Sequence, residues 1–504
     1  FQALLALMDF QEGKRDEAVA ALEAILATPE DLGEEGQNVK IILSRMQETM
    51  GNTVGARRLI EEVLAENARQ VDALKMQATW QIQSDETDAA IANLRIALDA
   101  APEDVQAMNL MAQAYERSGS HELARDFLAL AVDASGNAPE PSLRYARLLM
   151  QEERYLPAED ILVTALRQTP GNLGILVTLG QIYVQMEDTA RATQVVDTLR
   201  RMETEEATAA SNQLQTAILN LTSGADEAMG FLEQLATGEN ADIRQKLALL
   251  QAKFRQGDLE EALTMAQTLV AENPGDRPLQ YALAIAQSAN GDLETAEATL
   301  REVLATGPGS PQIWLALTRI LERQGDTVGA DAALADGLAA LPDEPNLLWA
   351  RASTLERTGD IDGAIDIYQG LYAKMSDSII IANNLASLLA TYRTDDESLE
   401  QAWTIARRLR DTEVPAFQDT YGWIAFRRGD AAEALPYLEG AAAGLDSDPI
   451  VQFHLAQVYE ALGRTSEALN QLEKTIQIAG PTDTRPQIEQ ARTDVIRLRE
   501  AVKN

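Results

Sequence analysis

The sequence has 504 residues, enough for about three to five ordinary domains or for one elongated repeat array. Hydrophobic residues make up 46% and charged residues 24%, which is the composition of a folded protein and excludes a disordered tail or a collagen-like fibre. The 79 acidic and 42 basic side chains leave a formal net charge of −37, and so acidic a protein is a poor partner for nucleic acids and anionic lipids.

Two absences narrow the class of protein further. There is no cysteine, which excludes disulfides, cysteine-based zinc sites and thiol nucleophiles. No run of about 18 apolar residues occurs, so we expect no membrane span. The densest apolar stretch, Ile379 to Leu389, is interrupted by Asn383 and Asn384.

An alanine recurs along the whole chain at nearly constant intervals. Nine of the thirteen intervals are 34 residues, and the others are 32, 36 or 38. Such a period is the signature of a repeat protein with fourteen units. The repeating alanines are Ala18, Ala56, Ala90, Ala124, Ala158, Ala192, Ala228, Ala262, Ala296, Ala330, Ala364, Ala402, Ala434 and Ala468.

Each unit has the features of a helical hairpin. When the recurring alanine is numbered position 20, position 15 is glycine in nine units, where it suits a tight turn between two helices. Position 8 is small in thirteen of the fourteen units, with Leu250 as the exception, and a small residue lets two helices approach closely. The glycines are Gly13, Gly51, Gly119, Gly257, Gly291, Gly325, Gly359, Gly429 and Gly463.

This pattern resembles the tetratricopeptide repeat family, whose 34-residue signature is W-x2-L-G-x2-Y, then A-x3-F, then P. The sixth unit carries Leu179-Gly180-x2-Tyr183, and the tenth carries Trp314-x2-Leu317, Ala330-x3-Leu334 and Pro342. The fourteenth carries Leu455-Ala456-x2-Tyr459 and Ala468-x3-Leu472. The resemblance implies an all-α, right-handed α-solenoid of about fourteen hairpins with a C-terminal capping helix.

In chain order, the array divides into four parts. Residues 1–204 hold units one to six, and residues 205–242 hold a degenerate seventh unit that we expect to act as a hinge. Residues 243–482 hold units eight to fourteen, and residues 483–504 form the capping helix. We also expect the array to bend at an insertion near Glu30 to Asn38 and at Thr394 to Ser398 in unit twelve.

The first unit starts partway into its first helix. We therefore expect further sequence upstream of Phe1, with a signal peptide, a lipid anchor or another domain as the alternatives.

No motif for catalysis or for a cofactor is present. His121 and His454 are the two histidines and lie far apart in the sequence, so we assign them to surface or packing roles. No phosphate-binding loop, dinucleotide fingerprint or zinc motif occurs, and the Gly359 to Gly363 run fits the turn of a repeat better than a calcium loop. We predict a protein that is not an enzyme and that needs no cofactor or metal.

The family resemblance sorts the remaining aromatic residues. It implies that positions 2, 5, 9 and 12 of each first helix face a concave groove, where aromatic side chains and nearby polar ones would grip a partner. The alternative is that the aromatic residues pack between neighbouring units. The candidate groove residues are Phe254, Tyr281, Arg319, Trp349, Ser353, Asn383, Trp423, Phe426, Phe453 and Gln457.

An arginine recurs at position 13, near the carboxyl end of the first helix. There it would offset the exposed carbonyls and the helix dipole; the alternative is a ladder of arginines that holds acidic side chains of a bound peptide. These residues are Arg117, Arg255, Arg323, Arg357 and Arg427.

Together these features predict a non-enzymatic scaffold that holds a protein or peptide partner, as an extended chain or a helix, in its groove. The final units resemble large bacterial envelope proteins and lipoproteins of this family, on the residues Asn383-Asn384-Leu385-Ala386, Asp419 to Trp423 and His454-Leu455-Ala456. That resemblance implies a role in polysaccharide or protein export and a periplasmic or outer-membrane-tethered location, with the cytoplasm as the alternative.

Two other functions stay open from the sequence. One is the regulatory or substrate-recruiting arm of an enzyme whose catalytic domain lies outside this chain. The other is binding of divalent cations by the acidic surface.

Overall fold

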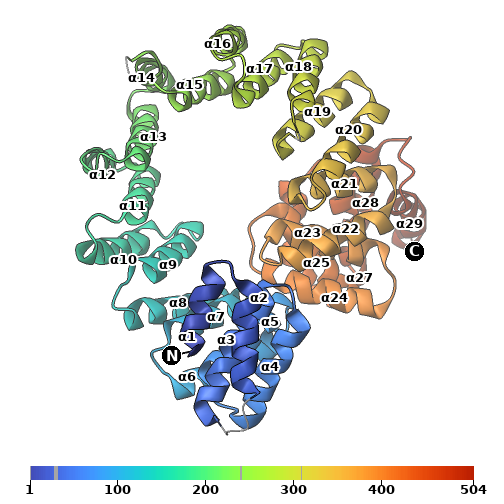
Figure 1. Ribbon diagram of the computed structural model, residues 1–504. Helices are drawn as coiled ribbons and strands as arrows, with labels where there is room; N and C mark the ends of the chain where they lie inside the picture. The colour runs from blue at the N-terminus through green and yellow to red at the C-terminus, as the bar shows by residue number, and fades with distance from the viewer. Residues whose placement is uncertain (1, 28–31, 239–240, 308, 504) are drawn as a thin grey trace. The chain divides into compact units, whose positions relative to one another are not determined.

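The structure is a computed structural model that describes residues 2–27, 32–238, 241–307 and 309–503. Within these ranges the regular elements are 29 α-helices and one short 3₁₀ helix, and no strand is present (Figure 1). The predicted all-α class is therefore confirmed, while the right-handed sense of the solenoid stays a prediction.

Two consecutive helices fall in each of the fourteen predicted units. The first helices are α1 (Gln2–Gln11), α3 (Gly33–Thr49), α5 (Val71–Gln83), α7 (Val105–Arg117), α9 (Pro139–Gln151), α11 (Leu173–Gln185), α13 (Glu205–Thr222), α15 (Ile243–Gln256), α17 (Arg277–Ala289), α19 (Pro311–Gln324), α21 (Pro345–Thr358), α23 (Ile379–Tyr392), α25 (Pro415–Arg427) and α27 (Pro449–Ala461).

The second helix of each unit carries the recurring alanine. These helices are α2 (Arg15–Leu26), α4 (Thr53–Glu66), α6 (Thr87–Ala100), α8 (His121–Ala134), α10 (Tyr155–Gln168), α12 (Thr189–Arg200), α14 (Ala225–Thr237), α16 (Leu259–Glu272), α18 (Leu293–Ala305), α20 (Thr327–Ala340), α22 (Ile361–Lys374), α24 (Asp396–Ala406), α26 (Ala431–Gly444) and α28 (Thr465–Ala479). The 3₁₀ helix η1 (Arg407–Leu409) follows α24, and α29 (Pro486–Lys503) ends the chain.

The turns inside the hairpins explain the recurring glycine. All nine glycines at position 15 have a positive φ, between 73° and 96°, a conformation that glycine adopts without the steric cost paid by other residues. Three other units reach the same conformation with a larger residue, namely Asp85, Glu153 and Glu187, at φ of 59°, 56° and 56°. The turn thus requires this backbone geometry whichever residue occupies it.

The recurring alanine is the centre of each hairpin's packing. All fourteen of these alanines are at most 3% exposed. Position 8 is small for a related reason: a Cβ added to Gly422 would lie 2.8 Å from Leu438 Cγ, so the two helices of that unit approach too closely for a larger side chain. The last helix, α29, buries an apolar face made by Ile488, Ala491 and Val495, as expected of the predicted cap.

The chain divides into two compact units. Unit 1 comprises residues 1–141 and 372–504, and unit 2 comprises residues 142–371. The two segments of unit 1 therefore flank unit 2 in the sequence. The compact units carry numerals, whereas the repeat units keep numbers written as words. The predicted boundaries at residues 204 and 242 both fall within unit 2 and stay predictions, as does the hinge.

Two of the predicted irregular places lengthen a first helix. The predicted insertion near Glu30 to Asn38 overlaps the start of α3, which has 17 residues, and the degenerate unit seven begins with α13, which has 18; residues 28–31 and 239–240 of these regions lie outside the described ranges. Among the described residues, no helix is both long and apolar enough to cross a lipid bilayer.

Candidate partner-binding surface

The ten predicted groove residues are divided between the two units. Unit 2 contains Phe254, Tyr281, Arg319, Trp349 and Ser353, whereas unit 1 contains Asn383, Trp423, Phe426, Phe453 and Gln457. Each half is therefore described on its own.

In unit 1, three of the predicted aromatic residues lie together on α25 and α27. The ring centroid of Trp423 lies 5.3 Å from that of Phe426 and 6.5 Å from that of Phe453. Aromatic pairs in this range contribute about 0.5–1.5 kcal/mol beyond the area they bury. Phe453 is buried and belongs to a core that includes residues of α28 and α29, so it supports the surface, while Trp423 and Phe426 are only partly buried.

His454 joins this group, although the sequence pointed only to a surface or packing role. Its imidazole is 3% exposed and stacks on the indole of Trp423, with ring centroids 4.0 Å apart and planes 14° apart. Its Nδ1 lies 2.9 Å from Asp419 Oδ1. Because the carboxylate can only accept, Nδ1–H donates this hydrogen bond, and in the neutral form of the ring Nε2 is then an acceptor. We call Asp419, Trp423, Phe426, Phe453 and His454 the Trp423 cluster.

The two stacked rings each keep a buried polar atom. Within the described part of the chain, Trp423 Nε1 and His454 Nε2 have no hydrogen-bond partner. Buried polar atoms are nearly always paired in native proteins, so an unpaired one calls for an explanation. The cluster thus holds a buried indole N–H and a buried imidazole nitrogen, and both lack a partner in the described structure.

The other two predicted residues of unit 1 lie on the first helices α23 and α27. Asn383 on α23 is buried, and its Oδ1 has no partner among the described residues. Gln457 on α27 donates from Nε2 to Asp494 Oδ2 on α29 at 3.4 Å. First helices of units twelve, thirteen and fourteen therefore all contribute polar groups beside or within the aromatic surface.

In unit 2, Trp349 is the most exposed of the predicted aromatic residues. It is 43% exposed, and Arg319 and Ser353 are exposed as well. Tyr281 and Phe254 are partly buried against the core, and burial raises the pKa of the Tyr281 hydroxyl although the charge of Arg319 opposes this. Trp349 is therefore the tryptophan of unit 2 with which Trp423 of unit 1 can be compared.

The recurring arginines make contacts that the sequence only partly foretold. Arg323 Nη1 donates to the carbonyl of Ser288 at 3.0 Å, and Arg427 donates to the carbonyl of Ala390. Both acceptors lie near the carboxyl end of the first helix of the preceding unit, whereas we expected each arginine to act on its own helix. Arg357 pairs with Glu322, also in the preceding unit, at 3.1 Å. These arginines therefore join neighbouring units.

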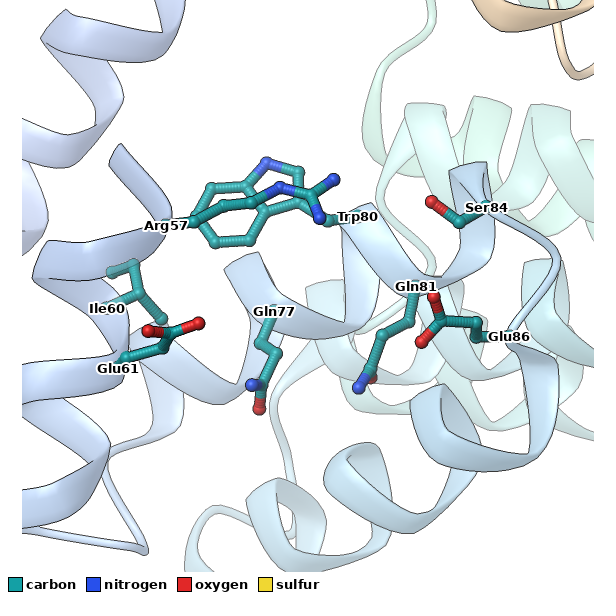
Figure 2. Close-up of a pocket in the computed structure, with 8 residues that line it drawn as sticks. All are labelled: Arg57, Ile60, Glu61, Gln77, Trp80, Gln81, Ser84 and Glu86. Atoms are coloured by element: carbon teal, nitrogen blue, oxygen red, sulfur yellow. The ribbon is translucent and has the colours of Figure 1, made fainter. Parts of the chain in front are cut away.

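A small polar hollow of about 130 Å³ lies beside Trp80, a residue that the groove positions of the family missed (Figure 2). Figure 2 shows the side chain of Arg57 lying across the indole, and the guanidinium carbon is 5.5 Å from the ring centroid. Asn93 Nδ2 donates to the amide oxygens of Gln77 and Gln81 at 2.9 Å, and the Trp80 indole donates to Glu48. Because these polar groups satisfy one another, the Trp423 cluster is the stronger candidate.

In the described ranges, no group of three or more His, Cys, Asp or Glu side chains is placed to hold a metal ion.

Comparison with known proteins identifies the family. One tetratricopeptide repeat model matches residues 149–218, 253–320, 287–354 and 425–486, and a second matches residues 75–139. Together they cover more than half of the chain, and the chain belongs to the tetratricopeptide repeat family. No curated protein matches the sequence.

Solved structures show a likeness that concerns the fold alone. The APC/C hetero-tetramer Cut9–Hcn1 matches with 13% identity and a TM-score of 0.40, covering 97% of this chain and 95% of that one. Naa15/Naa10 bound to HypK matches with 14% identity and a TM-score of 0.40, covering 100% and 91%. A tetratricopeptide repeat protein from Parabacteroides merdae has 17% identity and a TM-score of 0.33, covering 49% and 96%.

Proposed function

We propose that this protein is a non-enzymatic scaffold that holds an extended peptide or a partner helix against the first helices of units twelve to fourteen, with the Trp423 cluster as the anchor. Members of this family bind protein partners, and the present chain has the family's repeat along more than half of its length. The observation that carries the proposal is the pair of stacked rings whose Trp423 Nε1 and His454 Nε2 atoms are buried without partners in the described structure.

The cluster offers what a specific contact needs. Large aromatic rings supply apolar area at a low entropic cost, and tryptophan is among the residues that most often dominate binding energy. Because both atoms are buried, a partner reaches them only when the side chains that cover them move on binding; a peptide unit then accepts from Trp423 Nε1–H and donates to Nε2 of the neutral His454 ring, so that two buried groups gain hydrogen bonds. Phe426 adds apolar surface one helical turn from Trp423.

The test is affinity capture from a lysate of the source cells, with native protein and two single variants, W423A and W349A. Trp423 lies in unit 1 and Trp349 in unit 2, so each variant removes one tryptophan from one candidate surface. We expect W423A to lose a prominent captured protein that native protein and W349A retain, with unchanged helicity by circular dichroism. Loss with W349A alone would place the binding surface in unit 2 and overturn the proposal.

We further propose that the scaffold works in the bacterial envelope, in the periplasm or tethered to the outer membrane, within an assembly that exports polysaccharide or protein. The support is the resemblance of its last units to envelope proteins of the family. Fractionation of the source cells tests this: the protein should appear with periplasmic or membrane markers. Its appearance only with cytoplasmic markers would contradict the location.

A further inference from the structure

Asp85 occupies a position where nine other units have glycine. It adopts the positive φ of 59° that the turn requires, a conformation that disfavours residues with a side chain. Glu153 and Glu187 do the same in two other units, but their side chains are exposed, whereas Asp85 is only 5% exposed. A buried carboxylate and a disfavoured backbone conformation both cost free energy, so surrounding contacts must hold Asp85 in place. Residues in such conformations cluster at functional sites.

The reason lies in what the carboxylate contacts. Asp85 Oδ1 accepts from Arg117 Nη1 at 3.1 Å and from Arg408 Nη2, and its Oδ2 accepts from the Tyr372 hydroxyl at 2.5 Å. All three donors are at least half buried, and burial raises the pKa of Tyr372, with the charge of Asp85 adding to the effect, so the hydroxyl keeps its proton and donates. Tyr372 lies 287 residues and Arg408 lies 323 residues further along the chain than Asp85.

The same contact extends over a second set of groups. Arg117 Nη2 donates to Ser376 Oγ at 2.7 Å and to Asp377 Oδ1 at 2.5 Å, and Arg408 Nη1 donates to the carbonyl of Ser376 at 2.6 Å. Arg117 thus bridges the turn between α5 and α6 and the loop that precedes α23. It is a recurring position-13 arginine, but it contacts residues of a distant unit as well as those of its neighbour.

Backbone contacts support the ionic ones. Arg407 Nη2 donates to the carbonyl of Asp85 at 3.3 Å and to Thr87 Oγ1 at 3.2 Å. A Cβ added to Gly119 would lie 2.2 Å from the carbonyl oxygen of Arg407, so the α7–α8 turn packs directly on η1. His121 Nε2 lies 3.1 Å from the carbonyl oxygen of Arg410. Two stretches of unit 1, residues 85–121 and 372–410, therefore meet over a continuous contact.

The overall charge of the two segments opposes this contact. Residues 1–141 carry 25 acidic and 11 basic side chains, and residues 372–504 carry 20 and 14, so both segments are negative and repel each other at long range. The attraction is local, because Arg407 and Arg408 of the second segment face Asp85 of the first. Removal of Asp85 would leave the guanidinium groups of Arg117 and Arg408 buried without their shared counter-charge, which is strongly unfavourable.

We propose that the ion cluster of Asp85, Arg117, Tyr372 and Arg408 is a latch that holds the two segments of unit 1 together, and that unit 1 opens at this contact when the latch is broken. Asp85 occupies a position that is usually glycine because both arginines donate hydrogen bonds to its carboxylate. Unit 2 is joined covalently to both segments, so opening changes the constraint on both ends of unit 2.

The absence of cysteine from the chain makes a direct test simple. Cysteines placed at the exposed residues Glu122 and Glu413, one in each segment, carry spin labels for pulsed distance measurement. The variant D85G removes the carboxylate and gives the turn its favoured residue, so the hairpin should keep its helicity. The matched control E153G makes the same replacement at an exposed turn position. A second variant, R408M, removes a charge from the opposite segment without touching the turn.

We expect a narrow distance distribution in the native chain and in E153G, and a distribution at least twice as broad, with a longer mean, in D85G and in R408M. A narrow native distance that persists unchanged in both D85G and R408M would overturn the latch, because the contact would then hold without its central charges. A broad distribution already present in the native chain would overturn it equally, since the segments would not be held together.

Discussion

The indole of Trp423 stacks on the imidazole of His454 with ring centroids 4.0 Å apart, and Asp419 holds the Nδ1 side of that imidazole at 2.9 Å. The three side chains come from two consecutive first helices, α25 and α27. Asp419 is thus a positioning residue: it fixes the ring orientation of His454, and His454 in turn supports the face of Trp423. A partner that rests on Trp423 would depend on all three.

The positioning role of Asp419 can be tested through stability. In D419A the buried Nδ1–H of His454 loses its acceptor, and an unsatisfied buried donor costs about 1–3 kcal/mol. The control D419N keeps an amide oxygen that can still accept, so its loss should be clearly smaller. Urea denaturation followed by circular dichroism measures both. Equal midpoints for D419A and native protein would show that the hydrogen bond does not hold the ring.

The turn positions give a prediction of opposite signs for two substitutions. Glu187 adopts a φ of 56° and is exposed, so E187G should raise the stability by about 1 kcal/mol because glycine relieves the left-handed conformation. Gly257 adopts a φ of 88° and has no atom within 4 Å of an added Cβ, so G257A should lower the stability by a similar amount through the backbone alone. Melting temperatures would contradict this account if both substitutions shifted them in the same direction.

The arginines that join neighbouring units provide a matched pair. Arg323 donates to both the carbonyl and the hydroxyl of Ser288, at 3.0 and 2.7 Å, whereas Arg255 at the same repeat position is exposed and makes no such bond in the described structure. We expect R323A to destabilise the protein by about 1 kcal/mol and R255A by less than about 0.5 kcal/mol. Chemical denaturation of the two variants decides the point, and similar losses would mean that position 13 acts only through the charge at the helix end.

Asp104 predicts a defined pH dependence. Its carboxylate accepts from the Ala107 backbone N–H at 2.7 Å and from Lys75 Nζ at 2.8 Å. Burial by itself would raise the pKa of Asp104, but the hydrogen bonds and the charge of Lys75 outweigh it and hold the pKa below its ordinary value of 3.8. Because the folded-state pKa is depressed, this stabilisation is complete above that value and is lost as the pH falls through the folded-state pKa.

The variant D104N isolates this contribution. At neutral pH it should be less stable than native protein by about 1 kcal/mol, because the amide still caps the helix but removes a charge that pairs with the buried Lys75 ammonium. Between about pH 4 and pH 2 the difference should shrink, because native protein loses the carboxylate charge that D104N never had. Denaturation midpoints measured across this range check the sign, and a constant difference at all pH values would refute it.

The repeat could be read from the sequence because it rests on local rules. The period of 34, the small residue at position 20 and the glycine at position 15 each follow from packing or from backbone geometry within one hairpin, and the structure has all nine predicted glycines at positive φ. The helical pairs and the buried face of α29 follow from the same rules.

What the sequence did not show depends on contacts between units. The role of His454 depends on its contact with Asp419, 35 residues earlier. In the sequence, Asp85 is only a turn position that lacks the usual glycine. Its carboxylate meets Tyr372 across 287 positions, and no periodic pattern records a contact over that separation. The division of the groove residues between two compact units depends on which hairpins contact one another. The position of a residue within its repeat does not predict such contacts.

The central claim is that the Trp423 cluster anchors the partner, and its most direct test is the dissociation constant of the captured partner for native protein, W423A and W349A, measured by isothermal titration calorimetry. Loss of an aromatic anchor costs about 2 kcal/mol or more, so W423A should raise the dissociation constant by at least about thirtyfold, while W349A should leave it within about twofold. An unchanged constant for W423A, or a large rise for W349A alone, would contradict the claim.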